Sequence, residues 1–205
     1  LNKFKKGHGD ILLGTQMIAK GLDFDNITLV VVVNADLGMY VPDFKSHEKM
    51  FQLIYQVIGR AGRSNKQSQA IIQTYNPNNK VIQMATQYNL KKFYNIQLKN
   101  RKDLSYPPFI RLIRIIFKST YIKKCQSSTM VIYDLLRKSF SSDLIGPLPC
   151  PIEKLSNKFR YHIIIKASHS KFGIILKEIN NIQNQKEVLI SNQVTMLIDI
   201  DANSV

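Results

Sequence analysis

The most informative segment of the sequence is Gln56-Val57-Ile58-Gly59-Arg60-Ala61-Gly62-Arg63. On a helix, Gln56, Arg60 and Arg63 are spaced i, i+4 and i+7, so they share one face. Arginine presents a planar, permanently charged fork that matches phosphate oxygens, and such a group stabilises the charge that develops on a transferring γ-phosphoryl group. The segment therefore predicts a helix end that faces a nucleotide. The alternative is a helix end with two exposed arginines and no ligand.

This segment ends an expected helix that is anchored in a core. Ser46 is expected to cap the helix, which runs to about Ala61, and Glu48 lies in its positive first turn. Apolar side chains gather on the face opposite Gln56, namely Phe51, Ile54, Tyr55 and Ile58. Such a scaffold would project one amide and two guanidinium groups in the same direction.

A second segment, Gly14–Phe24, reads GTQMIAKGLDF. It lies between an expected short strand at Asp10–Leu13 and a β-branched run at Thr28–Asn34, which is typical of a strand buried on both faces of a parallel sheet. Its first residues offer backbone N–H and hydroxyl donors to a phosphate. Lys20 adds a cation, and Asp23 is suited to accept hydrogen bonds from a ribose or to position an arginine. The alternative is an ordinary polar loop between a strand and a helix.

The remaining pattern predicts two folding units. A strand at Gln69–Tyr75 continues an α/β layer pattern, and the chain from Lys80 to about Asp103 is helical, in two pieces. Pro107 and Pro108 break that helix, so we place a domain boundary there. Beyond it the expected order is βαββαβ, the plan of ferredoxin-like domains: strand Phe109–Lys118, helix Tyr121–Phe140, strand Leu144–Gly146, strand Tyr161–Ala167, helix Lys171–Asn184 and strand Val194–Ile200.

The composition favours a polyanionic partner. The net charge is +15 and is spread evenly, since residues 1–106 carry 15 Lys and Arg against 7 Asp and Glu, and residues 107–205 carry 14 against 7. Nucleic acid is the usual partner of such a chain, and a lysine-rich surface without a ligand is the alternative. Two isolated cysteines, Cys125 and Cys150, form no zinc pattern and no disulfide framework, which favours a reducing cytoplasm. No apolar run reaches the ~18 residues of a membrane span.

Together the two segments resemble motifs V and VI of superfamily 2 helicases, which lie on the second RecA-like lobe. Their residues and spacing are similar to those of PriA-type primosomal helicases (primosomal protein N-prime). The family patterns I-L-x-G-T-Q-M-x-x-K-G-x-x-F, P-D-F-[RK]-x-x-E-[RK] and Q-V-x-G-R-A-G-R match Ile11–Phe24, Pro42–Lys49 and Gln56–Arg63. The resemblance continues in the family's order to the end of the chain, at Tyr106–Phe109, Ile145–Pro149, Arg160-Tyr161 and Ile198–Asp201.

The resemblance implies roles at a nucleotide. Arg63 resembles the arginine that reaches the γ-phosphate, and Arg60 and Gln56 resemble its neighbours at the nucleotide interface. Gly21 and Asp23 resemble the motif V positions near the ribose and the interface between the lobes.

It also implies roles at DNA. Thr15 and Gln16 resemble an element that couples ATP to the DNA backbone, with Lys20 as a further DNA contact. The domain after Pro107 resembles the family's C-terminal domain, which implies branched and single-stranded DNA, single-stranded-DNA-binding protein and other primosome proteins as partners. Its candidate phosphate contacts are Arg111, Arg114, Lys158, Arg160 and Lys166, with a solvated basic face as the alternative for each.

Several family features are missing or altered. The sequence has no G-x-x-x-x-G-K-[ST] phosphate loop and no D-E-x-H box, so the resemblance implies that the ligands of ATP and Mg²⁺ lie on a first lobe outside this sequence. The family's zinc-binding cysteines are likewise absent, and we assign no metal ligand. Leu1–Phe4 lacks an initiating Met and is expected to continue from a longer protein. Lys45 and Lys49 stand where arginine is common, and Ala202 follows Asp201 where proline is usual.

The sequence therefore predicts an α/β chain with part of a second RecA-like helicase lobe at 1–90, a helical linker at 91–106, and a ferredoxin-like α+β C-terminal DNA- and partner-binding domain at 107–205. The expected function is part of an ATP-dependent 3′→5′ DNA helicase that restarts stalled replication forks and promotes primosome assembly in the cytoplasm, with this chain inactive by itself. The alternative is a non-catalytic DNA- and protein-binding remnant. A helicase of the RecG or Mfd type is disfavoured by the double-proline junction and the ferredoxin-like tail.

Overall fold

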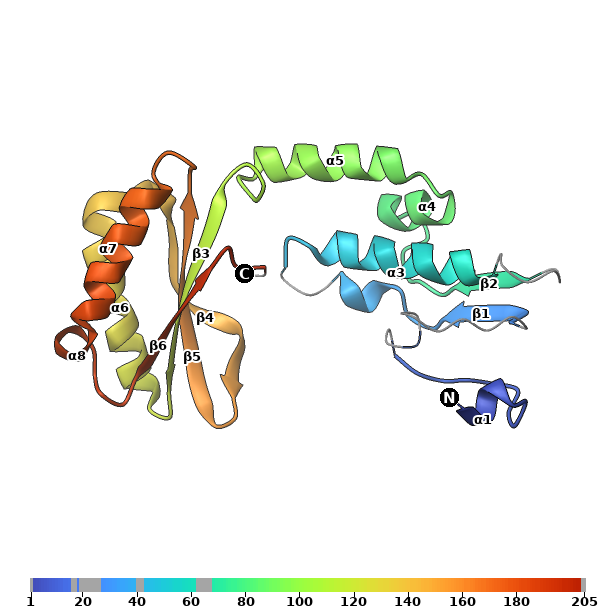
Figure 1. Cartoon of the computed structure of the whole chain (residues 1–205), viewed down its shortest axis with the longest axis horizontal. Helices are drawn as coiled ribbons and strands as arrows, with labels where there is room; N and C mark the ends of the chain where they lie inside the picture. The colour runs from blue at the N-terminus through green and yellow to red at the C-terminus, as the bar shows by residue number, and fades with distance from the viewer. Residues whose placement is uncertain (1, 16–17, 19–26, 40–42, 62–67, 204–205) are drawn as a thin grey trace. The chain divides into compact units, whose positions relative to one another are not determined.

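The computed structural model describes residues 2–15, 18, 27–39, 43–61 and 68–203. The chain divides into two compact units, Leu1–Gln97 and Leu98–Val205 (Figure 1). The division falls inside helix α5 (Leu90–Asp103). None of the helices in the described part of the chain is both long and apolar enough to cross a membrane.

The first unit contains a two-stranded parallel sheet with helices on one face. β1 (Leu29–Val32) pairs with β2 (Gln69–Ile72), and α3 (Ser46–Ala61) connects them, which is the βαβ arrangement that parallel strands require. The other described elements of this unit are α1 (Asn2–Lys5), the 3₁₀ turn η1 (Asp36–Gly38), α4 (Lys80–Thr86) and the first half of α5. Its core consists of Ala35, Met50, Phe51, Ile54, Val81, Ile82, Met84, Ala85 and Phe93.

Helix α3 ends at Ala61 as expected, and its apolar face runs through its described side chains. It begins at Ser46 itself, so the prediction of Ser46 as the residue before the helix is wrong by one position. Glu48 lies in the first turn as predicted. The helices predicted between Lys80 and Asp103 are confirmed as α4 and α5.

The strands of the first unit differ from the predictions. β1 is shorter than Thr28–Asn34 and is not buried on both faces: Leu29, Val31 and Val33 are 50 %, 46 % and 62 % exposed. Among the described residues, helices cover only the face that carries Val32 and Ile72, so the side chains that alternate to the other face meet solvent. The strand predicted at Asp10–Leu13 is not formed, since no described strand pairs with it.

The buried carboxylate of Asp36 joins the ends of the two strands. Its Oδ1 accepts a hydrogen bond from Thr74 Oγ1 at 2.8 Å, and its Oδ2 accepts one from the Tyr75 amide at 2.8 Å. The amide of Asp36 donates to Asn34 Oδ1 at 3.0 Å. The strand predicted to reach Tyr75 ends at Ile72, and the residues after Gln73 bond with this carboxylate instead.

Helices α4 and α5 both end in a residue with a left-handed backbone. These residues are Tyr88 (φ 55°) and Ser105 (φ 52°), at positions where glycine is usual. In each case the next amide reaches back to the last helical turn: Asn89 N donates to Met84 O at 2.8 Å, and Tyr106 N donates to Arg101 O at 2.7 Å. Both helices are therefore closed by Schellman motifs.

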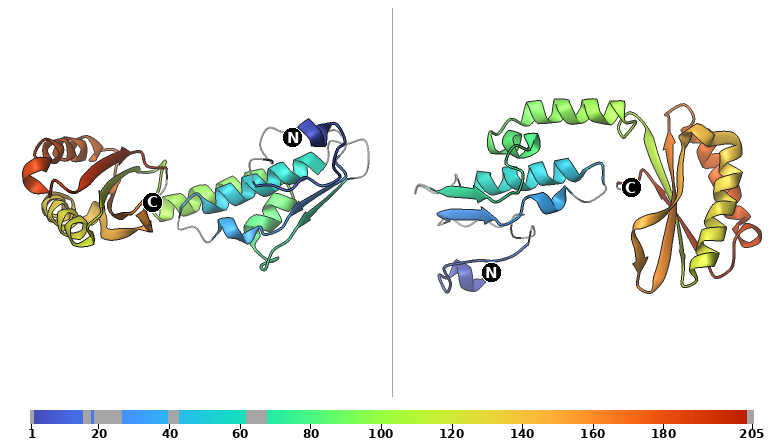
Figure 2. Two further views of the ribbon diagram at one scale, coloured as in Figure 1. Left: turned by 90° about the horizontal axis from the view of Figure 1, so that it is seen from below. Right: turned by 180° about the vertical axis from the view of Figure 1, so that it is seen from behind.

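The second unit is the predicted ferredoxin-like domain. Its four strands are β3 (Arg111–Ser119), β4 (Leu144–Leu155), β5 (Lys158–Ala167) and β6 (Thr195–Ile200), and every neighbouring pair in the order β4-β5-β3-β6 is antiparallel. Helices α6 (Ile122–Phe140) and α7 (Phe172–Asn184) cover one face (Figure 2). The short elements η2 (Ser141–Asp143) and α8 (Lys186–Leu189) lie in the connections.

The core of this unit lies between the sheet and the two helices. Inward-facing residues of β3 and β5 alternate along each strand and meet one apolar stripe from each helix. The fully buried members include Ile113, Ile115, Phe117, Ile132, Leu136, Ile163, Ile165, Ile175 and Ile179.

Strand β4 is longer than the predicted Leu144–Gly146. Three prolines favoured an early end. However, β4 is an edge strand, so a proline whose missing N–H would point away from β5 removes no hydrogen bond between strands. Its pairing with β5 shifts register twice to accommodate them. Gly146 (φ +118°) has a structural requirement, since a Cβ there would lie 2.9 Å from the carbonyl oxygen of His162.

The aromatic pair in the core of the first unit gives a stability prediction. Phe93 of α5 stacks on Phe51 of α3 with ring centroids 3.9 Å apart, and both rings are 1 % exposed. We expect Phe93→Ala to lower the free energy of unfolding by about 3–5 kcal/mol, because it leaves a cavity between the two helices. Urea unfolding followed by circular dichroism measures this loss.

The matched control is Tyr94→Ala, on the same helix, where the ring is 45 % exposed. This change should cost less than about 1 kcal/mol. Equal losses for the two variants would show that the stacked pair does not hold α5 against α3.

Candidate nucleotide and DNA contacts

Helix α3 presents Gln56 to solvent from a buried scaffold. Phe51, Ile54 and Val57 are 1 %, 0 % and 5 % exposed, and Tyr55 and Ile58 pack partly buried against the same core. Gln56 is exposed on the other side. The predicted separation of an apolar and a polar face on this helix is therefore confirmed over its described side chains.

The two arginines of the same segment cannot be compared with Gln56 in this way. The backbone of Arg60 is helical, but its side chain lies outside the described part of the structure, as do Gly62 and Arg63 altogether. The shared direction of Gln56, Arg60 and Arg63 stays a prediction.

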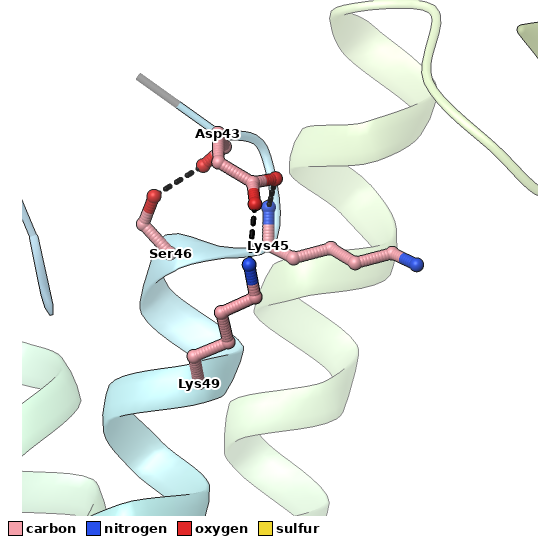
Figure 3. Close-up of polar contacts among 4 residues, drawn as sticks. All are labelled: Asp43, Lys45, Ser46 and Lys49. Carbon is pink, nitrogen blue, oxygen red and sulfur yellow. Dashed lines mark hydrogen bonds and ion pairs between the residues drawn. The ribbon is translucent and has the colours of Figure 1, made fainter. Parts of the chain in front are cut away.

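The start of α3 is fixed by the buried carboxylate of Asp43 (Figure 3). Its Oδ1 accepts a hydrogen bond from the Lys45 amide at 2.9 Å, and its Oδ2 forms an ion pair with Lys49 Nζ at 2.6 Å. The Ser46 hydroxyl donates to the carbonyl oxygen of Asp43. Lys49 thus makes a single contact with one carboxylate oxygen, where arginine would offer two. The spacing of these residues was visible in the sequence, but the ion pair was not predicted.

The motif V residues are largely outside the described structure. Thr15 is described and exposed. Gln16, Lys20, Gly21 and Asp23 all lie outside the described residues, so their predicted roles stay predictions.

Arg111 is engaged within the second unit. Its Nε donates to Asp201 Oδ1 at 2.8 Å, a second bond joins Nη2 to Oδ2, and its guanidinium carbon lies 3.5 Å from the centroid of the Phe172 ring. The bond to Arg111 lowers the pKa of the Asp201 carboxyl. This cluster joins the start of β3, the end of β6 and the start of α7. Arg111 and Asp201 were singled out separately in the sequence and Phe172 was not, because only the fold brings the three together.

The residue after Asp201 is held to β3 by a backbone hydrogen bond. Ala202 is buried and its N–H donates to the carbonyl oxygen of Leu112 at 3.0 Å. Proline, which is usual at this position in the resembling family, has no N–H and could not make this bond. Alanine in place of proline at position 202 therefore permits a backbone hydrogen bond to Leu112.

Arg114 is buried, at 7 % exposure, and its Nε donates to Nδ1 of His162 at 2.9 Å. His162 is itself 4 % exposed. Burial lowers the pKa of His162 to about 4, and the positive charges of Arg114 and Arg160 act in the same direction. The burial of Arg114 disfavours it as a phosphate contact, and its role at DNA stays a prediction.

The remaining candidate cations lie on β5, on the face of the sheet that α6 and α7 do not cover. Lys158 is exposed and Arg160 is half-buried, with its Nη1 3.5 Å from the carbonyl oxygen of Ile152. Lys118 of β3 lies directly opposite Arg160 in the antiparallel register. Lys166 is half-buried and donates to the carbonyl oxygen of Leu104 at 2.8 Å. Lys118 was missed in the sequence, because only the pairing of β3 with β5 places it beside Arg160.

Apolar residues accompany these cations on the same face. Leu197, Ile116, His162 and Leu148 form one cross-strand row, in which Leu197 and Leu148 are 42 % and 45 % exposed. The next row holds Thr195, Lys118 and Arg160. The face is thus apolar, with Lys118, Lys158 and Arg160 at one end of the two central strands. Asp199, opposite Arg114, is the acidic residue that the register adds to it.

The described residues hold no group of three side chains suited to a metal ion. Cys125 and Cys150 are both free thiols in buried positions. Burial raises the pKa of the Cys125 thiol, which keeps it protonated. These cysteines do not fit a zinc site.

Comparison with known proteins gives two family matches and several relatives. Residues 1–65 match the helicase conserved C-terminal domain, and residues 102–203 match the primosomal protein N C-terminal domain. The chain is 38 % identical over 206 residues to the replication restart protein PriA of Bacillus subtilis (strain 168), covering 99 % of this chain and 25 % of that protein.

Two further relatives carry the same name. The protein of Chlamydia pneumoniae is 39 % identical over 171 residues (82 % of this chain, 23 % of the relative), and that of Borreliella burgdorferi is 37 % identical over 203 residues (98 % and 30 %). The chain spans about a quarter of the length of the curated relatives it matches.

The buried Arg114–His162 pair predicts a loss of stability in mild acid. His162 stays neutral in the folded chain down to about pH 4, whereas in the unfolded chain it takes up a proton below about pH 6.5. Between these values the unfolded state binds more protons, so stability falls as the pH falls. From pH 7 to pH 5 we expect this histidine to account for a loss of about 2 kcal/mol.

His162→Asn tests this assignment, because the asparagine oxygen can replace Nδ1 as the acceptor for Arg114 and does not titrate. Chemical unfolding of both proteins at pH 7 and pH 5 gives the comparison. The variant should show a smaller loss between the two pH values than the parent chain. A loss of the same size in both would assign the acid sensitivity to other groups.

Proposed function

Because the chain belongs to the PriA family of replication restart proteins, we propose that it forms part of an ATP-dependent 3′→5′ DNA helicase that restarts stalled replication forks and promotes primosome assembly. The match of residues 1–65 to a helicase C-terminal domain supports this proposal most directly. In the same proposal the protein lies in the cytoplasm, with branched and single-stranded DNA, single-stranded-DNA-binding protein and other primosome proteins as partners.

In this proposal α3 is the element that brings charge to the nucleotide. The buried side of the helix fixes its direction, and Gln56 is exposed on the other side. If the helical spacing continues past the described residues, Arg60 and Arg63 would project on the same side as Gln56. Closure of two lobes on ATP would bring Arg63 to the γ-phosphate, with Gln56, Arg60, Gly21 and Asp23 at the same interface. An arginine in that position stabilises the charge of the transition state and is pre-positioned by its own lobe.

This chain supplies only one side of such a site. Its sequence has no phosphate loop and no acidic metal box, so the contacts of Mg²⁺ and of the β-phosphate would come from a first lobe. The resemblance implies that the ligands of the family's zinc lie outside this sequence, whose only cysteines are Cys125 and Cys150. Hydrolysis by this chain alone is therefore not expected.

The second unit supports a DNA-binding part of the same function. Lys118, Lys158 and Arg160 lie together on the uncovered face of the sheet, where phosphates can approach. Thr15, Gln16 and Lys20 would contact the DNA backbone from the first unit. Arg111 and Arg114 are the weaker candidates, since each already has a partner within its own unit.

A second candidate function is a DNA- and partner-binding module without catalysis. The cations on the uncovered face of the sheet favour it, because that surface needs no first lobe. The gene sequence immediately upstream decides between the two functions: an in-frame first lobe with its phosphate loop supports the helicase, and stop codons there support the binding module.

The role of Arg63 is tested in the intact helicase that contains this chain. Arg63→Ala should lower DNA-stimulated ATP hydrolysis by about 10³-fold at saturating ATP, because the γ-phosphate loses its cation. DNA affinity, measured by fluorescence anisotropy, should stay unchanged. Arg137→Ala, at an exposed position on α6, is the matched control. Undiminished turnover in Arg63→Ala would remove the role assigned to this residue.

The role of Arg160 is tested through the salt dependence of DNA binding. A lysine or arginine that contacts one phosphate adds about 0.7–0.9 to the slope of log affinity against log salt. We expect Arg160→Ala to reduce the slope by about this amount, with equal weakening for different DNA sequences. Lys177→Ala, exposed on α7, serves as the control on the helical side. An unchanged slope in Arg160→Ala would place the DNA elsewhere.

A further inference from the structure

The junction between α5 and β3 is held by many polar contacts. The last turn of α5 is closed by Ser105 in a left-handed conformation, with Ser105 N donating to Lys102 O at 3.2 Å and Tyr106 N donating to Arg101 O at 2.7 Å. Phe109 N then donates to Tyr106 O at 3.1 Å. The junction is therefore an ordered turn, although its sequence has the composition of a linker.

Side chains from three places bind the carbonyl groups of this turn. Arg101 Nη1, from α5 itself, donates to Pro107 O at 2.9 Å. Lys166 Nζ, from β5, donates to Leu104 O at 2.8 Å. His169 Nε2, just after β5, donates to Pro108 O at 3.1 Å. These carbonyls have no partner within a helix or strand, so each side chain satisfies a group that would otherwise need water.

Lys166 makes the central contact. Besides its bond to Leu104, its Nζ lies 4.1 Å from the centroid of the Tyr106 ring, which is within cation–π range. Burial removes water from its ammonium group and thereby lowers the pKa of that group. The Leu104 carbonyl oxygen and the Tyr106 ring take the place of this water. A cation at Leu104 O also complements the negative end of the α5 dipole. Lys166 is therefore occupied with the junction.

We propose that Leu104–Phe109, with Arg101, Lys166 and His169, forms a clasp that fixes the end of α5 to the sheet of the second unit, so that helix end and sheet move as one body. Within the first unit the same helix is anchored by Phe93, which stacks on Phe51 of α3. One continuous helix is thus attached at both of its ends, to the helix that carries Gln56 and to the sheet that carries Arg160. Lys166 is a positioning residue of this clasp.

The consequence for function rests on the proposed helicase activity. A movement of the helicase lobe would pass along α5 to the C-terminal domain, because the clasp begins at Leu104, directly after the last residue of α5. The clasp would then couple ATP turnover to the placement of the DNA held by the second unit.

The clasp itself is tested on the whole chain, independently of any activity. Spin labels at Lys99→Cys on α5 and Lys138→Cys on α6, both exposed positions, report the distance between the helix end and the second unit. Cys125 and Cys150 are buried, and a sample without the introduced cysteines measures any labelling of them. The parent chain should give one narrow distance distribution by pulsed electron spin resonance.

Lys166→Met combined with Arg101→Met should broaden this distribution by about twofold or more, because the turn then behaves as a flexible connection. Lys166→Arg should restore most of the narrow distribution, since a guanidinium can reach the same carbonyl and ring. Lys177→Met is the matched control. A broad distribution in the parent chain, or no broadening in the folded double variant, would overturn the proposal. If the double variant does not fold, Lys166→Met alone decides in the same way.

Arg101→Met in the intact helicase tests the coupling. DNA-stimulated ATP hydrolysis should be retained, and the number of base pairs unwound for each ATP should fall about two- to tenfold. Equal unwinding for each ATP would overturn the coupling. Absence of ATP hydrolysis in the parent protein would instead contradict the proposed function and leave the distance measurement as the test of the clasp.

Discussion

The burial of one face of α3 is the interaction on which the rest of the first unit depends. Two strands cannot form a stable layer without a cover, and a 16-residue helix needs its apolar stripe in a core to be stable in water. Phe51 and Ile54 meet both needs, since they belong to the core cluster against which Val32 and Ile72 of the strands pack, and Phe51 stacks on Phe93 of α5. The polar face of the helix has a fixed direction only because this contact exists, and the proposed nucleotide contact depends on that direction.

Periodic patterns in the sequence were sufficient to predict much of the fold. The bounds of α3 and the βαββαβ order of the second unit followed from apolar spacing, which acts locally and is written in consecutive residues. Contacts between distant residues could not be predicted in this way. The bond from Arg114 to His162, the pairing of Lys118 with Arg160, and the carboxylate of Asp36 beneath Thr74 each depend on which strands become neighbours. For the same reason, β4 continued through prolines that suggested its end, because its position at the sheet edge is a property of the whole sheet.

The cations of the second unit show why net charge alone does not locate a binding surface. Arg111 is neutralised by Asp201, Arg114 is buried against a neutral histidine, and Lys166 binds a main-chain carbonyl. These three groups stabilise the domain and its junction, whereas Lys118, Lys158 and Arg160 remain on an uncovered face. The same residue types therefore serve two purposes, and only their partners distinguish them. The candidate contact set that results is smaller than the one the sequence suggested and includes a lysine from another strand.

The uncovered side of β1 and β2 has a practical consequence for work with this chain. Leu29, Val31 and Ile71 form a contiguous apolar strip along two strands, each about half exposed. Among the described residues β1 and β2 pair with no further strand, and an apolar strip next to such strand edges is a template for self-association. At high concentration the isolated polypeptide will tend to oligomerise and precipitate through this strip. Dilute solutions of low ionic strength, in which the positive charge of the molecules keeps them apart, are the conditions that favour a monodisperse sample.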